Sequence, residues 1–414
     1  MRKMRDSGIA WIGVIPQDWE IVRTKSLYCS AKEIAGDRAD DFERLALTLN
    51  GVIKRSKEDS VGLQPEKFSG YQILKKGELV FKLIDLENVA TSRVGLSPYT
   101  GIVSPAYIVL SKQSRAKDLV VRYSMYHFLS MWQREIFNQM GDNGVRSSLN
   151  AKELLNIPHP FPSIYEQKRI VTFLDAQCAE IDAVLEKTRA SIEEYKKLKQ
   201  AVITQAVTKG IRGDRPMKDS GIEWIGDIPA EWDVIRVKQL LKERNERSKE
   251  GKEEPLSMSQ KVGLVPTKFL ESIPNMASSF VGAKLAYVDD LVFNKLKAHL
   301  GVFSVSRYDG LVSPDYAVYC STGKSNLKYL EYIFKTPQCI GEFRKKSTGI
   351  AAGLMRLYTE GLFSIYLPYP ALSEQEEIAE YLNEKCAGID ALIAKKQQYL
   401  TEIENYKKSL IYEY

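Results

Sequence analysis

A segment of about 20 residues occurs twice in this chain, and the repeat constrains the fold more than any other feature. The first copy, residues 6–27, reads DSGIAWIGVIPQDWEIVRTKSL, and the second, residues 219–240, reads DSGIEWIGDIPAEWDVIRVKQL. The two tryptophan pairs are equally spaced, since 224 − 11 and 232 − 19 both give 213. A period this long excludes a solenoid and indicates that a whole module of about 200 residues has been duplicated.

The repeated segment carries two tryptophans on either side of a proline. Pro16 favours an extended chain at the entry to the module, and Trp11 and Trp19 supply large apolar surfaces. We expect these aromatic residues to anchor the segment to its own module. Direct contact with a ligand is the alternative.

The composition indicates a globular protein with room for two ordinary cores. The chain has 414 residues, of which 44% are hydrophobic and 27% charged. The net charge of +6 permits nucleic-acid binding without demanding it. No apolar run approaches the roughly 20 residues of a membrane span, and no hydrophobic signal region follows the first charges, so we expect a cytoplasmic protein. The 5 cysteines and 3 histidines lack zinc-site spacing, which predicts reduced thiols and no metal.

Short runs rich in β-branched and aromatic residues predict strands in both modules. In the first module they are Leu45–Ile53, Gly77–Leu86 and Gly101–Leu110, followed by a helical pattern over Val120–Met140. The corresponding runs in the second module are Leu256–Val265, Asp290–Lys295 and Gly310–Tyr319. The offset between the copies drifts by a few residues, which is typical of small loop insertions on a common scaffold.

A heptad pattern begins after residue 163 and recurs after residue 373. Ser163 and Glu166 fit a capping box, as do Ser373 and Glu376, and the first pattern ends at Lys209-Gly210. Positions a of the first copy are Val171, Cys178, Leu185, Ile192, Lys199 and Ala206, and positions d are Leu174, Ile181, Thr188, Tyr195 and Val202. The second copy has Cys386, Ile393 and Leu400 at a, and Leu382, Ile389, Ile403 and Leu410 at d.

Two heptad helices in one chain are expected to pair with each other. Each would be about 60 Å long at about 1.5 Å per residue. The residues expected to form the pairing are Leu174, Cys178, Ile181, Leu185, Ile192, Leu382, Cys386, Ile389, Ile393 and Leu400. The cysteines at equivalent a positions, Cys178 and Cys386, should be buried thiols rather than a disulfide. The outer helix faces remain available to a partner.

Motifs for catalysis are missing from the sequence. Gly323-Lys324-Ser325 resembles the end of a phosphate-binding loop, but position 318 is Val318 and the first glycine of the motif is absent. We find neither N-P-P-[YF] nor D-P-P-Y, and Pro314-Asp315 has no E-x-K nearby. The sequence therefore favours a binding protein.

The ordered set of motifs resembles the specificity subunits of type I restriction–modification systems, over nearly the whole chain. Each copy opens with W-I-G-x-I-P-x-x-W and continues to P-x-P, then E-Q-x-x-I and a long helix. The first copy carries Trp11, Gly13, Pro16, Trp19, Pro160, Pro162, Glu166, Gln167, Ile170, Leu174, Ile181 and Asp182; the second carries Trp224, Gly226, Pro229, Trp232, Pro368, Pro370, Glu374, Gln375, Ile378, Leu382, Ile389 and Asp390. The tail 202–210, VITQAVTKG, departs from this equivalence, because the second copy reads LIYEY over 410–414.

The resemblance implies an α+β fold with a pseudo-two-fold internal repeat. Two mixed α/β target recognition domains, residues 1–162 and 211–372, would be separated by helices at 163–210 and 373–414 that pair as an antiparallel coiled coil. The chain would be a non-catalytic subunit without a cofactor of its own. Each domain would read one half of a bipartite double-stranded DNA target, while the helices set the spacing and dock two methyltransferase (modification) subunits. Restriction subunits would join that complex.

Basic side chains in the module loops are the expected phosphate contacts. In the first module these are Lys54, Arg55, Lys57, Lys82, Arg93 and Arg146, and in the second Lys261, Lys268, Lys295, Lys297, His299 and Arg356. A solvated surface charge is the alternative for each. Two other functions stay open: the recognition part of a related restriction–methylation enzyme, and a scaffold that binds proteins only.

Overall fold

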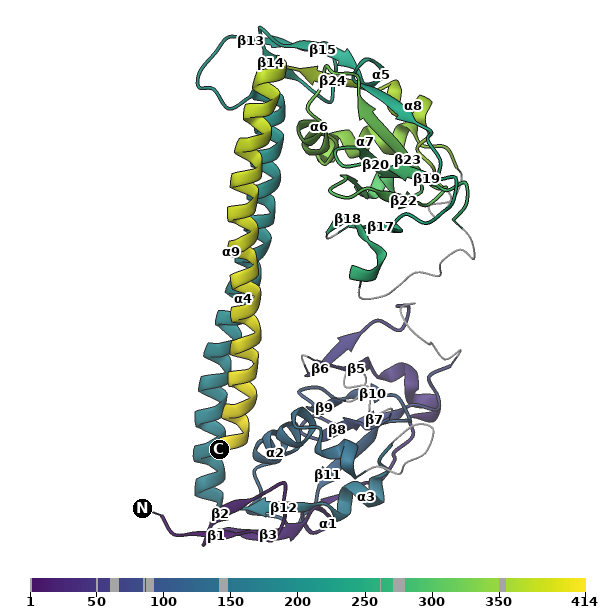
Figure 1. Ribbon diagram of the computed structural model, residues 1–414. Coiled ribbons are helices and arrows are strands. Elements are labelled where there is room, and N and C mark those ends of the chain that lie inside the picture. The colour runs from purple at the N-terminus through teal and green to yellow at the C-terminus, as the bar shows by residue number, and fades with distance from the viewer. Residues whose placement is uncertain are drawn as a thin grey trace. The chain divides into compact units, whose positions relative to one another are not determined.

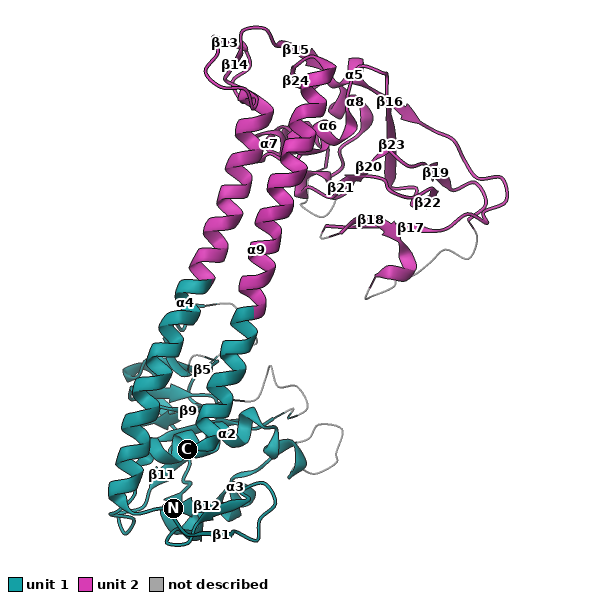
Figure 2. Cartoon of the chain, turned by 60° about the vertical axis from the view of Figure 1, so that its left-hand side comes forward, with its two compact units in different colours: residues 1–188, 399–414 teal, residues 189–398 magenta. Residues whose placement is uncertain are grey.

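The computed structural model describes residues 2–49, 51–59, 67–84, 86, 93–140, 148–260, 262–270, 280–349 and 355–414. The chain forms two compact units, coloured separately in Figure 2. Unit 1 comprises Met1–Thr188 and Tyr399–Tyr414, and unit 2 comprises Arg189–Gln398. No helix within these described ranges combines the length and hydropathy that a membrane span requires.

Unit 1 is built from two four-stranded sheets and two strand pairs (Figure 1). The sheets are β6 (Gly51–Arg55)–β5 (Arg44–Thr48)–β10 (Gly101–Val103)–β7 (Gln72–Leu74) and β4 (Tyr28–Cys29)–β11 (Ile108–Lys112)–β8 (Leu79–Lys82)–β9 (Arg93–Leu96). The pairs are β1 (Met4–Asp6) with β2 (Val14–Pro16) and β3 (Glu20–Arg23) with β12 (Pro158–Phe161). The short helices are α1 (Thr24–Leu27), η1 (Gly36–Asp41), α2 (Val121–Gln133), η2 (Ile136–Gln139) and α3 (Ala151–Asn156).

Strand β8 explains the continuous apolar run L-V-F in the sequence. Leu79 and Phe81 point into one apolar cluster, which includes Phe128 of α2. Val80 points into a second cluster on the opposite side, with Leu74. Because side chains alternate across a strand, a strand with cores on both faces must be apolar throughout.

Unit 2 repeats this architecture (Figure 1). Its four-stranded sheet, β16 (Leu241–Arg244)–β23 (Tyr316–Ser321)–β20 (Leu291–Asn294)–β21 (Phe303–Val305), has the same order of equivalent strands as β4–β11–β8–β9. The strand pairs are β13 (Met217–Asp219) with β14 (Asp227–Pro229), β15 (Asp233–Arg236) with β24 (Tyr366–Tyr369), β17 (Leu256–Ser259) with β18 (Gly263–Pro266), and β19 (Lys284–Ala286) with β22 (Gly310–Val312). The helices are α5 (Val237–Leu240), η3 (Thr267–Phe269), η4 (Ala298–Leu300), α6 (Leu327–Phe334), α7 (Pro337–Lys346) and α8 (Thr359–Phe363).

The helix expected over Val120–Met140 is interrupted. Helix α2 ends at Gln133, and η2 begins at Ile136. Between them Glu135 has a left-handed backbone with φ of 57°. A helix of L-residues does not pass through that conformation, so the single helix predicted from spacing is wrong.

The two long helices are α4 (Ile164–Lys209) and α9 (Leu372–Glu413), and each passes through both units. In unit 1, Leu174 and Cys178 of α4 share an apolar cluster with Leu410 and Ile411 of α9. In unit 2, α4 contributes Ile203, Ala206 and Val207 to a cluster that also contains Ile378, Ala379, Leu382 and Cys386 of α9. The helices therefore pair within each unit.

Ion pairs across the helices show that the pairing is antiparallel. In unit 1, Lys407 Nζ lies 2.6 Å from Asp182, and in unit 2, Lys199 Nζ lies 2.6 Å from Asp390. Both sums of residue numbers, 182 + 407 and 199 + 390, equal 589, as an antiparallel register requires. Both lysines occupy a positions of the heptad pattern, where apolar residues are usual. These polar residues take part in the helix pairing through their ion pairs.

The residues expected to pair differ in their burial. Leu174, Cys178, Leu185, Ile192, Leu382 and Cys386 are buried, whereas Ile181, Ile389, Ile393 and Leu400 are half-buried. Both a-position cysteines are buried free thiols, as predicted. Burial raises the pKa of both thiols, which favours the unreactive protonated form.

We expect the charge pair Asp182–Lys407 to contribute little to stability, because both side chains are partly solvated. A double-mutant cycle with Asp182→Ala and Lys407→Ala should give a coupling free energy of about 0.5 kcal/mol by urea denaturation. The repeated pair Lys199–Asp390 serves as the matched cycle. A coupling free energy several times larger in either cycle would contradict the expectation that these partly solvated pairs contribute little to stability.

Candidate nucleic-acid interface and its supporting clamps

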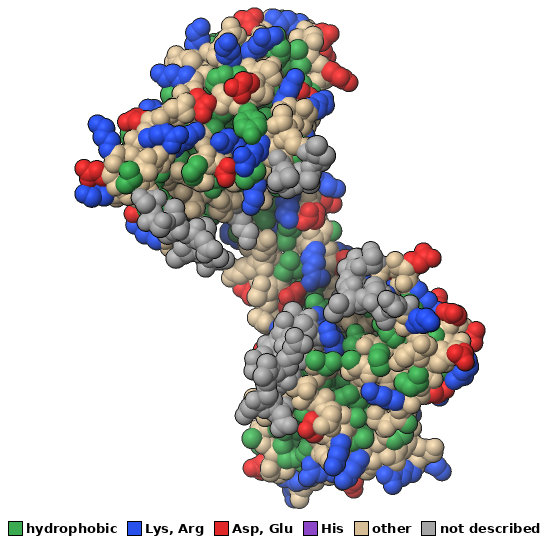
Figure 3. Space-filling view, turned by 90° about the vertical axis from the view of Figure 1, so that its right-hand side faces the viewer, with side chains coloured by type: hydrophobic (Ala, Val, Ile, Leu, Met, Phe, Trp, Pro, Cys, Tyr) green, Lys and Arg blue, Asp and Glu red, His purple; other side chains and the backbone are tan. Residues whose placement is uncertain are grey.

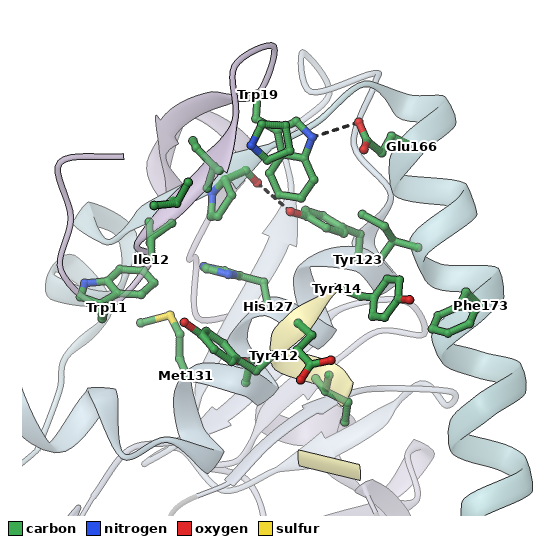
Figure 4. A pocket seen from close by; sticks show the side chains of 18 of the residues that line it. Trp11, Ile12, Trp19, Tyr123, His127, Met131, Glu166, Phe173, Tyr412 and Tyr414 are labelled. Atoms are coloured by element: carbon green, nitrogen blue, oxygen red, sulfur yellow. Dashed lines mark hydrogen bonds between the residues drawn. The ribbon is translucent and has the colours of Figure 1, made fainter. Parts of the chain in front are cut away.

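The second tryptophan of each repeat is fixed by the glutamate at the start of the following long helix. Trp19 Nε1 donates to Glu166 Oε2 at 3.0 Å, and Trp232 Nε1 donates to Glu374 Oε2 at 2.9 Å. An arginine completes each group, which we call the tryptophan clamp of its unit. Figure 4 shows the Trp19–Glu166 bond in unit 1.

The clamp arginines each hold two carboxylates. Arg215 Nη1 lies 2.8 Å from both Glu374 and Glu231. In unit 1, Arg2 pairs with Glu166 and, at 2.8 Å, with Asp18. The hydrogen bond from Arg2 holds the pKa of Glu166 below its usual value, so this carboxylate stays charged.

The glutamine after each clamp glutamate ties the long helix to the domain. Gln167 accepts the Val120 N–H at 2.8 Å, and its amide donates to the carbonyls of Pro162 and Asp118 at 2.9 and 3.1 Å. Gln375 accepts the Asn326 N–H at 3.0 Å and donates to Pro370 and Lys324 at 3.0 and 3.5 Å. Both amides are fully buried. They hold the starts of α2 and α6 against the long helices.

These roles of the glutamate and the glutamine are not apparent from the sequence alone. Ser163 Oγ accepts the Glu166 N–H at 3.3 Å, but the Glu166 carboxylate binds Trp19 and Arg2, so the capping box is half formed. The box predicted at Ser373 is wrong, because α9 begins one residue earlier, at Leu372. The signal in the sequence was that the second tryptophan of the repeat and the later Glu-Gln pair recur together in both copies.

Three of the basic residues predicted to bind DNA in unit 1 are neutralised by carboxylates. Lys54 lies 2.6 Å from Glu43, Arg55 lies 2.7 Å from Asp59, and Lys57 lies 3.3 Å from Asp40. These pairs gather on and around the hairpin β5–β6. An anion would have to displace a carboxylate to bind here.

Lys82 and Arg93 of unit 1 lie together. They face each other in the register of β8 and β9. The Arg93 guanidinium lies 5.8 Å from the ring centroid of Trp132 on α2, a cation–π distance. Arg146 lies outside the described residues.

The structure brings together three of the basic residues predicted in unit 2. The Lys295 carbonyl accepts the Leu357 N–H at 3.0 Å, which places Arg356 beside it, and Lys297 lies at the start of η4. Helix α7 packs against η4, and its last turn carries Arg344, Lys345 and Lys346. We call Lys295, Lys297, Arg344, Lys346 and Arg356 the basic face of unit 2.

Few charges oppose this basic face. Arg356 lies 3.5 Å from Asp315, and Lys295 Nζ donates to the Pro314 carbonyl at 3.2 Å. Lys297, Arg344 and Lys346 make no ion pair with a carboxylate in the described parts of the chain. Arg344 and Lys346 are not distinguishable from the sequence, because a basic last helical turn is commonplace.

Two other residues of unit 2 that were predicted to bind DNA are less suited to it. Lys268 lies outside the basic face, and His299 carries no charge. Lys268 on η3 pairs with Glu254 at 3.1 Å. Burial and the nearby Arg344 lower the pKa of His299, so its ring is neutral near pH 7 and offers no charge to a phosphate. Lys261 lies outside the described residues. On the face in Figure 3, Lys and Arg side chains are interspersed with Asp and Glu, in keeping with the small net charge.

Curated proteins resemble the chain along nearly its whole length, although no protein-family model matches it. It is 25% identical over 422 residues to the putative type I restriction enzyme MjaX specificity subunit of Methanocaldococcus jannaschii, covering 97% of this chain and 93% of that protein. The MjaVIII specificity subunit of the same organism is 23% identical over 419 residues, covering 96% and 92%. The Escherichia coli EcoDI specificity subunit is 22% identical, covering 69% of this chain and 68% of its own length.

Solved structures share the fold. A chain from a study of complex assembly and conformational transition of the type I R-M system superposes with a TM-score of 0.69 at 13% identity, covering 96% of this chain and 97% of that one. The HsdS subunit from Thermoanaerobacter tengcongensis gives a TM-score of 0.50 at 13% identity, covering 98% and 97%. The α+β fold with paired long helices, expected from the sequence, is confirmed.

Proposed function

We propose that this chain, which belongs to the specificity subunits of type I restriction–modification systems, binds a bipartite double-stranded DNA target, with one half read by each unit. The observation that carries the proposal is the duplication: equivalent sheets and equivalent tryptophan clamps occur in both units. Two equivalent readers in one chain suit a target with two separated halves.

The chain contributes recognition rather than catalysis. Methylation and cleavage belong to the modification and restriction subunits that assemble with it, and the chain has no cofactor of its own. Residues 1–162 and 211–372 are the target recognition domains in this proposal, and residues 163–210 and 373–414 are the spacer helices that dock the methyltransferase subunits. The complex works in the cytoplasm, where the DNA is.

The basic face of unit 2 and the pair Lys82–Arg93 of unit 1 are the phosphate contacts that the charges favour most. Each gathers positive charge in one place, and few described carboxylates oppose the basic face of unit 2, which is the arrangement that neutralises phosphates. The ion-paired Lys54, Arg55, Lys57 and Lys268 rank below them. Arg146 and Lys261 remain candidates for phosphate contact on the basis of the sequence alone.

The test of the function is a genome methylation map of a host with and without this chain, its partner genes intact. A bipartite motif with adenine methylation on both strands should vanish with the chain. Persistence of every such motif would overturn the DNA-reading function. Gel shifts with and without the methyltransferase test the scaffold alternative, since a protein scaffold shifts DNA in neither case.

Lys295→Ala should weaken DNA binding several-fold and reduce the slope of log K against log salt by about 1, because one phosphate contact is lost. The measurement is fluorescence anisotropy of a labelled target duplex with the assembled methyltransferase, at several salt concentrations. Lys218→Ala, on the exposed strand β13, is the matched control. An unchanged slope in Lys295→Ala would remove Lys295 from the interface.

A further inference from the structure

The hairpin of strands β17 and β18 in unit 2 ends in an exposed aliphatic side chain. The two strands form a two-stranded sheet of their own (Figure 1), and the loop that joins them includes Val262. Val262 is 63% exposed, although Leu256 and Leu264 of the same hairpin are buried. A single exposed aliphatic residue is common on protein surfaces, so its meaning depends on what surrounds it.

The loop of this hairpin is held at both of its ends. At one end, Gln260 Nε2 donates to the Leu300 carbonyl at 3.1 Å. At the other end, Gly263 has a φ of 76°, and a Cβ atom at this glycine would lie 2.6 Å from Ser304 Oγ of β21. Only glycine combines this backbone conformation with so close an approach. These contacts hold Val262 in a defined position.

The loop meets the basic face of unit 2 at η4. Leu300, whose carbonyl binds Gln260, has an exposed side chain, and its N–H donates to the Lys297 carbonyl at 2.9 Å. Helix α7, which carries Arg344, packs against η4. We call Val262 and Leu300 the aliphatic tip of unit 2. The tip therefore lies beside positive side chains, which suit phosphates, while its own groups suit an apolar feature of the same ligand.

Unit 1 has an equivalent hairpin, which also exposes an aliphatic side chain in its loop. The hairpins β5–β6 and β17–β18 correspond, because each has a buried leucine, Leu45 or Leu256, packed against the glycine that begins β10 or β22. Gly51 ends the loop of unit 1 with a φ of 89°, as Gly263 does in unit 2. Leu49 in that loop is 70% exposed. The feature recurs with a different aliphatic residue, as we expect of two readers with different half-sites.

Double-stranded DNA presents an apolar group to such a tip in its major groove. The methyl group on C5 of thymine lies there, whereas the minor groove presents only the hydrogen-bonding groups of the bases. The major groove, about 12 Å wide, also admits a two-stranded β-ribbon. A hairpin with an aliphatic tip and cations beside it fits this groove, since the cations can bind the phosphates at its edge.

We propose that the β17–β18 hairpin enters the major groove of the half-site read by unit 2, and that Val262 packs against the methyl group of a thymine. Leu300 shields this contact from water, and Lys297 and Arg344 bind the neighbouring phosphates. The proposal rests on the proposed function, because it names the groove and the base feature that unit 2 reads. Val262 is thus a specificity-determining residue.

The test removes the methyl group from the DNA and the side chain from the protein, separately and together. The ligand is a duplex with the bipartite target, and each of its thymines is replaced in turn by deoxyuridine, which lacks only the methyl group. Binding to the chain assembled with its methyltransferase is measured by fluorescence anisotropy. We expect one thymine of one half-site at which deoxyuridine weakens binding about fourfold, the value of burying one methyl group.

Val262→Ala should bind the thymine duplex and this deoxyuridine duplex equally, because the side chain that contacts the methyl group is gone. The side chain is exposed, so we expect the variant to fold as the natural chain does. Leu49→Ala is the matched control in unit 1, and it should keep the fourfold difference at this thymine. The comparison within each variant also cancels any effect of deoxyuridine on the duplex itself.

Two results would overturn the proposal: no thymine whose replacement weakens binding by the natural chain, or a difference at the sensitive thymine that persists in Val262→Ala. Either result leaves the proposed function intact, provided that the complex still prefers the target to a scrambled duplex. Equal binding of target and scrambled duplexes would instead overturn the proposed function. The two failures are therefore distinguished by the same titrations.

Discussion

Glu374→Ala should lower the free energy of unfolding of unit 2 by about 3–5 kcal/mol, the largest effect of a single charge that we expect in this chain. The Glu374 carboxylate accepts the Trp232 indole N–H and pairs with Arg215. The side chains of Arg215 and Glu374 are only 11% and 5% exposed. Removing the carboxylate leaves a buried cation and a buried N–H donor with one partner fewer, and water cannot replace the lost contact.

The measurement is urea denaturation followed by tryptophan fluorescence, with Glu166→Ala as the matched variant. The same clamp in unit 1 is more open, since Arg2 and Glu166 are 42% and 22% exposed. Water can therefore solvate what Glu166→Ala exposes, and we expect a loss of about 1 kcal/mol. Equal losses in the two variants would show that burial does not set the strength of the clamp.

Phe293→Ala should destabilise unit 2 by about 3–5 kcal/mol, because it empties the centre of an aromatic cluster. Phe293 is 2% exposed, and its ring centroid lies 4.5 Å from Phe303, 5.6 Å from Phe334 and 5.8 Å from Phe343. Aromatic pairs at these distances add to the free energy of burial. The neighbouring rings are packed against one another and cannot all move to fill the space.

Phe293→Leu is the control, since it keeps most of the volume and should cost about 1–2 kcal/mol. Thermal and urea denaturation of both variants give the comparison. DNA binding by the folded variants, measured below their melting temperatures, should change little, because the ring lies in the core. A Phe293→Ala variant as stable as the natural chain would contradict the packing described here.

The sequence by itself determined the architecture. The repeated tryptophan segment revealed the duplication, because each module needs the same anchors. The long helices were predictable because their heptad spacing follows from local geometry, and the strands because a two-sided core requires runs such as Leu79–Phe81. The family resemblance rested on the same ordered motifs. The break at Glu135 was not predictable, since a single left-handed residue leaves no periodic signal.

The tertiary structure decided what each repeated residue does. The partners Trp19 and Glu166 are separated by 147 residues, and no local pattern pairs an indole with that carboxylate. Likewise, the sequence shows that Lys54 and Lys297 are charged, but only folding puts Glu43 beside the first and leaves the second without a described carboxylate. The same holds for Trp19 and Trp232, which have similar sequence surroundings, yet Trp232 is 1% exposed and Trp19 is half-buried. Contacts between distant segments depend on how whole elements pack, so they are fixed by the fold and not by neighbouring residues.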